Sequence, residues 1–235
     1  MFDRLKKVFS RPEAGTDVAR AAEAAAPAAP AAVAAWARSR GWRCAASADG
    51  SATAVDGLVR DHKWLLEVGT STRRYIQGQE LRARAELGLQ EDLRVIVVSN
   101  TLKNALEEKA FAAYTDTLQT SMDSNMPEEM RWLMMYDEVP LDGLPEHFPA
   151  LFSVHGSDEA TPAQWVDPAL ARALVAAMPP RPEDAPPFLM MLLRGKLYLR
   201  MACGPGDTAT LQAASGLFLQ ACEAALDRLP KAGSH

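Results

Sequence analysis

The chain has 235 residues, of which 48% are hydrophobic and 23% charged, a composition typical of a water-soluble globular protein. Its 25 Lys and Arg face 30 Asp and Glu, and this formal charge of -5 disfavours nucleic acid as a partner. Cys44, Cys203 and Cys222 are far apart and lack CxxC spacing, which predicts neither a disulfide framework nor a zinc site. No stretch approaches the ~18 consecutive apolar residues of a membrane span, and no secretory signal is evident, so we expect a cytoplasmic protein.

The first residues form a short basic amphipathic segment. At helical spacing, the apolar side chains fall on one face and the basic ones on others: Phe2, Leu5, Val8 and Phe9 share a face, and Arg4, Lys6 and Lys7 lie elsewhere. The following stretch is rich in Ala, Pro and Gly, which predicts a flexible linker. We therefore divide the chain into a segment and linker over 1–31 and a globular domain over 32–235.

The domain is predicted to begin with a helix over 31–40 that Gly41 ends, followed by meandering strands. Turn signals at Asp49-Gly50, Asp56-Gly57 and Asp61-His62-Lys63 separate these strands, and residues 64–68 have the bulky content of one of them. Residues 80–87 alternate strictly between apolar and charged, which favours a strand with one wet face over a helix.

The central part of the chain is predicted to alternate strand, helix and strand. Residues 94–98 are apolar and β-branched, as in a central strand, and Ser99-Asn100 caps a helix after it. A second buried strand is predicted over 130–136. A loop rich in Pro and Gly follows over 140–149.

The last part of the chain carries consistent boundary signals. A short strand over 152–155 precedes a helix that Asp167 caps, with Pro168 in its first turn and Pro179-Pro180 at its end. Arg194-Gly195 joins a hairpin over 188–193 and 196–201, and a final helix follows residues 204–207.

These elements predict an α+β fold, a mainly antiparallel sheet of short strands with helices packed on one side. Residues 58–65 and 193–199 share a two-strand pattern. An arrangement in two similar halves, 32–125 and 126–235, is therefore an open alternative.

The best candidate for an anion site is the segment 69–74 with the arginines that surround it. Hydroxyls, exposed amides and guanidinium groups suit phosphate or carboxylate, and the candidate side chains are Arg73, Arg74, Arg82 and Arg84. The alternative is a solvated ladder, in which arginines on the polar face of a strand pair with Glu80 and Glu86.

No motif for catalysis is present. The chain lacks the Gly-x-Ser-x-Gly elbow, the HExxH helix and the Gly-x4-Gly-Lys-Ser/Thr loop, so we predict no catalytic residue, no metal site and no cofactor. His155 and Asp158 are the groups that would serve as a base if the arginine cluster bound a small anionic substrate.

Part of the chain resembles a family of uncharacterised bacterial proteins. The likeness covers residues 152–201 and consists of a Phe-x-Val strand at Phe152 and Val154, an Asp and a helix beginning near Pro168, and a hairpin ending in Gly-x-Leu-Tyr at Tyr198. The resemblance implies an α+β fold and assigns no catalytic residue. Members of that family carry membrane helices, which this sequence lacks.

Together these features favour a non-catalytic binding or adaptor module. Its N-terminal segment is the candidate for docking a protein partner or an anionic surface at the inner membrane, through Phe2, Leu5, Lys6, Lys7, Val8 and Phe9. An enzyme acting on a small anionic substrate bound by the arginine cluster is one alternative. A structural homodimer joined at the hairpin edges is the other.

Overall fold

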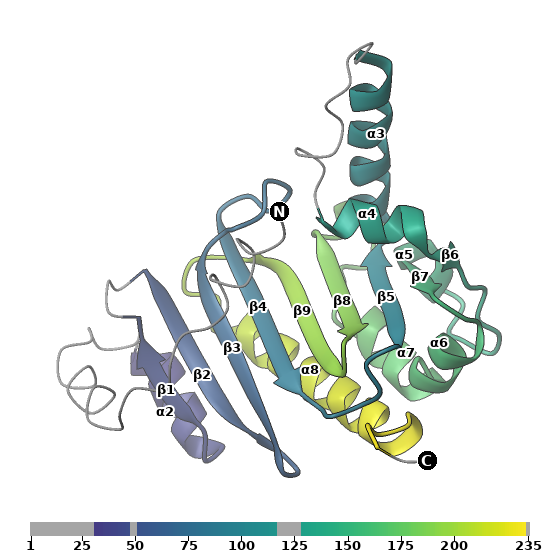
Figure 1. Ribbon diagram of the computed structural model, residues 1–235. Coiled ribbons are helices and arrows are strands. Elements are labelled where there is room, and N and C mark those ends of the chain that lie inside the picture. The colour runs from purple at the N-terminus through teal and green to yellow at the C-terminus, as the bar shows by residue number, and fades with distance from the viewer. Residues whose placement is uncertain (1–30, 48–50, 117–127, 234–235) are drawn as a thin grey trace, which may run out of the picture.

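The structure is a computed structural model that describes residues 31–47, 51–116 and 128–233. These residues form one nine-stranded sheet of order β1-β2-β3-β4-β9-β8-β5-β7-β6, in which neighbouring strands are antiparallel (Figure 1). With helices packed against this sheet, the predicted α+β class is confirmed. The amphipathic segment and linker predicted over 1–31 lie, except for Ala31, outside the described residues, as does the turn predicted at Asp49-Gly50.

The first half of the sheet is a meander. Helix α2 (Ala31–Ser39) leads into β1 (Arg43–Ala46), β2 (Ala52–Val59), β3 (His62–Thr70) and β4 (Gln79–Glu86), each strand pairing with the one before it. Gly41 has a φ of +72°, so it ends α2 in the left-handed conformation as predicted.

One turn in this meander differs from its prediction. Asp56-Gly57 lies inside β2, and the chain reverses at Arg60-Asp61, where Arg60 has a φ of +51°. Gly57 is needed there for a packing reason. A Cβ at this position would lie 2.8 Å from Cδ1 of Trp42, so the glycine makes room for an indole ring rather than for a turn.

The second half of the sheet interleaves strands from the end and the middle of the chain. The hairpin of β8 (Phe188–Leu193) and β9 (Lys196–Cys203) inserts between β4 and β5 (Arg94–Ser99), and β7 (Phe152–Gly156) and β6 (Asp137–Glu138) complete the sheet. Arg194 and Gly195 both have positive φ at the predicted hairpin turn. Segments 32–125 and 126–235 therefore share one sheet.

The main core lies between one face of the sheet and the helices α5 (Phe148–Leu151), α6 (Ala160–Trp165), α7 (Pro168–Ala176) and α8 (Thr208–Arg228). Figure 1 shows α8 crossing behind β4, β9 and β8. Trp165 is fully buried and donates from Nε1 to the carbonyl of Ala221 at 3.0 Å, which ties α6 to α8. Asp167 accepts from the amide of Leu170 at 2.8 Å and so caps α7 as predicted.

The opposite face carries a smaller core under α3 (Asn100–Asp116) and α4 (Glu128–Met135), so helices pack on both faces of the sheet and not on one side as predicted. It consists of apolar side chains from the two helices and from β5 and β8: Ile96, Val98, Leu102, Leu106, Met130, Leu133, Leu189 and Met191. Strand β5 is therefore buried on both faces, in agreement with its β-branched sequence.

The strand predicted over 130–136 is wrong, because residues 130–135 belong to helix α4 (Glu128–Met135). Met130 and Leu133, three residues apart, are buried, whereas Met134 and Met135 are 65% and 68% exposed. This one-sided burial has the helical period, and Glu128 and Glu129 in the first turn favour a helix N-terminus. None of the described helices combines the length and apolar character needed to cross a bilayer.

Candidate functional site

The sheet face opposite α8, called here the open face, is divided between two environments. The first turns of α3 and helix α4 pack against β5 and β8, and α3 then projects beyond the sheet, whereas no described helix lies over β2, β3, β4 and β9 on this side (Figure 1). We call this second region the uncovered half. The strand register sets two rows of side chains across it: Glu67, Arg82 and Arg200 in one, and Leu65, Arg84 and Tyr198 in the next.

Most charges of the uncovered half are neutralised by neighbours on adjacent strands. Four ion pairs join these strands: Arg82 with Glu67 at 3.2 Å, Lys196 with Glu86 at 2.7 Å, Arg43 with Asp56 at 2.6 Å, and Arg200 with Glu80. The first three pairs are partly exposed, as expected for a polar sheet face, whereas Glu80 is buried. Glu80 and Glu86 pair with Arg200 and Lys196 of β9 and not with the four candidate arginines. Arg84 is different, because it is exposed and makes no ion pair with any described residue.

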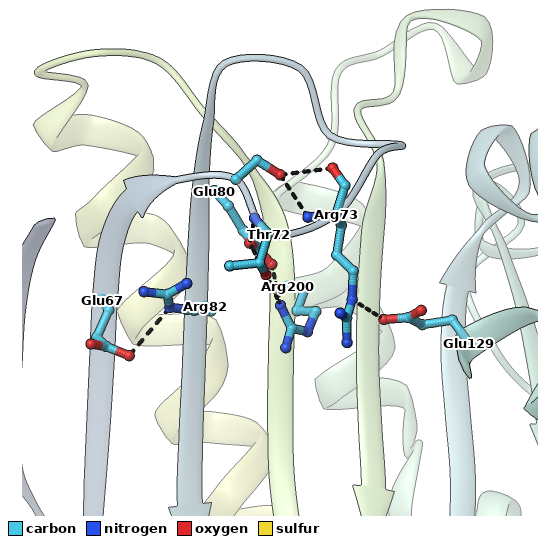
Figure 2. A network of polar contacts seen from close by, with 8 residues as sticks. Glu67, Thr72, Arg73, Glu80, Arg82, Glu129 and Arg200 are labelled. Carbon is cyan, nitrogen blue, oxygen red and sulfur yellow. Dashed lines mark hydrogen bonds and ion pairs between the residues drawn. The ribbon is translucent and has the colours of Figure 1, made fainter. Parts of the chain in front are cut away.

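A polar network closes the end of the uncovered half next to α4 (Figure 2). The carboxylate of Glu80 is buried and accepts from the amide and hydroxyl of Thr72 at 2.8 and 2.9 Å, in addition to its ion pair with Arg200. Burial by itself raises the pKa of Glu80, but the hydrogen bonds from Thr72 and the charge of Arg200 outweigh it, so this pKa lies below its ordinary value.

A second buried carboxylate fastens α4 to this network. Glu129 is 1% exposed and its Oε1 accepts from Nε of Arg73 at 2.5 Å, across the gap between the β3–β4 loop and the helix (Figure 2). Burial lowers the pKa of Arg73, but the negative charge of Glu129 raises it above its ordinary value. Oε2 of Glu129 and the hydroxyl of Tyr75 are buried without a hydrogen-bond partner among the described residues. Burial and the nearby charge of Glu129 raise the pKa of Tyr75.

The four candidate arginines are thus not one cluster. Arg73 is engaged by Glu129 and Arg82 by Glu67, while Arg74 in the β3–β4 loop is exposed without an ion pair to a described residue. Arg84 is the member that lies on the uncovered half with its guanidinium uncommitted.

His155 and Asp158 do not lie beside these arginines. One row of the sheet runs from Arg84 through β9, β8 and β5 to His155 on β7. At the usual strand spacing of about 4.8 Å, the two backbones are roughly 19 Å apart. Nδ1 of His155 lies 3.1 Å from the carbonyl of Tyr136, and Asp158 accepts from the amide of Thr161 at 2.7 Å at the start of α6.

A hollow of about 760 Å³ opens beside Arg84, between the α2–β1 connection and the ends of β2, β3 and β4. Its lining combines indole and leucine surface with cations: Trp42, Trp64, Leu58 and Leu65 supply the first, and Arg40, Arg43, Lys63 and Arg84 the second. Asp56 and Glu86 are the acidic residues in its wall. This mixture suits an anionic group attached to an apolar body.

Three tryptophans support the wall of this hollow. Trp36 and Trp42 meet edge to face at 5.3 Å between ring centroids, and Trp42 and Trp64 do so at 4.8 Å. Trp64 is buried, and no acceptor lies within hydrogen-bond distance of its Nε1 in the part of the chain that the structure describes. The missing side chain of Gly57 lets both Trp42 and Trp64 pack against β2.

Several of these residues carry no local signal in the sequence. Tyr198 and Arg200 join the site because β9 pairs with β4, and this pairing between distant parts of the chain follows from no local pattern. The strict alternation of residues 196–201 indicates which of their side chains share a face, but not which strand lies beside them.

Comparisons with known proteins give one similar structure. No family model and no curated protein matches the chain. The chain is similar to the crystal structure of the mycobacterial trehalose monomycolate transport factor A, TtfA, with 12% sequence identity and a TM-score of 0.44, over 84% of this chain and 94% of that one. The resemblance of residues 152–201 to a bacterial family stays a prediction.

Proposed function

We propose that this chain is a non-catalytic binding module that holds a protein partner against the uncovered half of the sheet. The supporting observation is Arg84, which is exposed at the centre of this surface and makes no ion pair within the described part of the chain. The cations in the adjoining rows, Arg82 and Lys196, are already paired. Arg84 is therefore available to a group outside the chain.

The neighbours of Arg84 have the character of a protein-binding surface. Tyr198 and Leu65 flank it on the adjacent strands, and both are partly buried. Arginine and tyrosine dominate the binding energy of many protein interfaces, because each combines a large contact area with directed hydrogen bonds. The row Leu65, Arg84 and Tyr198 therefore forms the centre of the proposed contact.

The balance of charge suggests what kind of partner fits. The whole chain has a formal charge of -5, yet the uncovered half keeps a positive excess, since Arg84 and Lys63 add to cations that are already neutralised. A partner with an acidic surface would be attracted to this side of the molecule and repelled by the rest.

We also propose that the N-terminal amphipathic segment supplies a second attachment, to an anionic membrane surface or to the same partner. The helical spacing of Phe2, Leu5, Val8 and Phe9 and the charges of Lys6 and Lys7 support this proposal. It would place the protein in the cytoplasm, peripheral to the inner membrane. The enzyme alternative receives no such support, because His155 and Asp158 lie far from Arg84 along the sheet.

Affinity purification from the native host tests the protein-binding role. The bait proteins are the wild-type chain, Arg84→Glu, and a matched control, Arg172→Glu, which reverses the charge of an exposed arginine on α7. We expect one stoichiometric partner with the wild type and with Arg172→Glu, and at least a tenfold lower yield with Arg84→Glu. Equal yields with both variants, or no stoichiometric partner with any bait, would contradict the proposal.

Sedimentation of the purified chain at two concentrations addresses the homodimer. A dimer that dissociates in Arg84→Glu but not in Arg172→Glu would assign the uncovered half to a second copy of this chain and overturn the proposal of a different partner. A monomer at both concentrations is the expected result.

A further inference from the structure

We infer that the hollow beside Arg84 is the pocket into which the partner inserts an acidic side chain together with a neighbouring apolar one. This inference rests on the proposed function and adds the chemistry by which the partner is recognised. It starts from the lining of the hollow, which contains both cations and apolar side chains.

After the existing ion pairs are taken into account, the hollow has cations without a partner, whereas both of its acidic side chains are already paired. Asp56 is paired with Arg43, and Glu86 is paired with Lys196. Arg40, Lys63 and Arg84 make no ion pair with a described residue, although all three line the hollow. Three cations without ion pairs in one hollow suit the binding of carboxylates. Each cation is exposed to water in the free protein, and each would gain an ion pair when a carboxylate of the partner binds.

The apolar part of the lining specifies what accompanies the carboxylate. Leu58 is 61% exposed near the end of β2, beyond the residues that pair with β1, and it lines the hollow together with Leu65 and Trp42. Cross-strand pairing sets Leu58 opposite Lys63, so an apolar surface and a cation stand side by side on the open face. A Leu, Phe or Trp of the partner would cover Leu58 while an adjacent Asp or Glu reaches Lys63 and Arg84.

The distribution of the cations favours a peptide over a single phosphate group. Phosphate sites usually gather several donors, often backbone amides, around one point. Here the cations come from three separate parts of the chain, the α2–β1 connection, β3 and β4, and line the hollow together with apolar side chains. Such separated cations match carboxylates spaced along a peptide chain better than one compact dianion.

Selection of peptides on the full chain tests this inference without knowledge of the natural partner. A random-sequence display library is selected on the immobilised protein, and the enriched peptides are synthesised and titrated. We expect Asp or Glu next to Leu, Phe, Trp or Tyr in these peptides, and an affinity about tenfold lower for Lys63→Gln/Arg84→Gln. A smaller loss of about threefold is expected for Leu58→Ser, and no change for Arg172→Gln on α7.

Other outcomes would overturn the inference. These are no enrichment, enriched peptides without acidic residues, or affinities that Lys63→Gln/Arg84→Gln leaves unchanged. Saturable binding of inorganic phosphate that Arg84→Gln abolishes would assign a phosphate site instead. If the natural partner still depends on Arg84 in affinity purification while the peptides fail, the proposed function stands and only the acidic-peptide pocket is wrong.

Discussion

The two halves of the open face belong to the same sheet but have opposite surfaces. One row across the strands shows the change: Arg84 and Tyr198 lie in the uncovered half, and Met191 and Ile96 lie under α3 and α4. Both halves share the core beneath α8 on the other side. Within the described part of the chain, helices therefore cover the apolar part of the open face, while most charged side chains of the uncovered half stay partly exposed, although Glu80 is buried.

The largest expected difference comes from placing the same charge in each half. Val98→Asp puts a carboxylate into the fully buried cluster under α3, and we expect a loss of about 4 kcal/mol in the free energy of unfolding, or no folded protein, since no described cation lies in that cluster. Leu65→Asp puts it on the uncovered half, where water and Arg84 are near, so a loss below about 1 kcal/mol is expected.

Urea denaturation of both variants measures this comparison. Val98→Ala serves as the control for lost apolar volume and should cost less than Val98→Asp. Losses of similar size for Val98→Asp and Leu65→Asp would show that the uncovered half is also sealed from water, contrary to our division of the open face.

The ion pairs at the boundary and on the uncovered half should also differ in strength. Arg73→Ala leaves the buried carboxylate of Glu129 without its cation, and a loss of about 2 kcal/mol in unfolding free energy is expected. Arg82→Ala breaks the more exposed pair with Glu67 and should cost less than about 1 kcal/mol.

The double variant Arg73→Ala/Glu129→Gln provides the control for the boundary pair. Removing the buried charge together with its partner should restore part of the stability lost in Arg73→Ala, because no uncompensated carboxylate remains. If Arg73→Ala and Arg82→Ala cost the same, the pair with Glu129 does not fasten α4 to the sheet.

A smaller effect is expected from acid, through Glu80. The pKa of this carboxyl in the folded protein lies below its ordinary value, because Thr72 and Arg200 hold the charged form. The stability it contributes is therefore complete above the unfolded pKa of about 4.3 and is lost as the pH falls through the folded pKa. Chemical denaturation at several pH values should show the wild type more stable than Glu80→Gln near neutrality, with the difference shrinking below about pH 5. A constant difference would contradict this.

Much of the fold followed from local patterns of burial. The alternation of residues 80–87 predicted the half-exposed strand β4, and the β-branched run 94–98 predicted β5, buried on both faces. Asp167 and Pro168 predicted the start of α7. These predictions succeeded because each depends on side chains within one element.

The failures have a different physical origin. Residues 130–135 form a helix in which Met130 and Leu133 are buried against α3 and β5, and a short apolar run alone fits either a helix or a strand. The pair Asp56-Gly57 is typical of a turn, but here the glycine leaves space for the indole rings of two tryptophans. At the candidate site, Arg84 was predicted, whereas Tyr198 and Lys63 join it through strand pairing that the sequence does not specify.

The smallest expected effect concerns the membrane, and it separates the N-terminal segment from the uncovered half. In co-sedimentation with vesicles containing phosphatidylglycerol, we expect the full chain to bind a few-fold more strongly than a chain lacking residues 1–30, since one short amphipathic segment binds weakly. Arg84→Glu should bind these vesicles as the wild type does, because the uncovered half is proposed to face a protein. Vesicles of phosphatidylcholine alone are the control for charge. Equal binding with and without residues 1–30 would show that the segment does not bind the membrane. Reduced binding of Arg84→Glu would show that the uncovered half contacts the lipid.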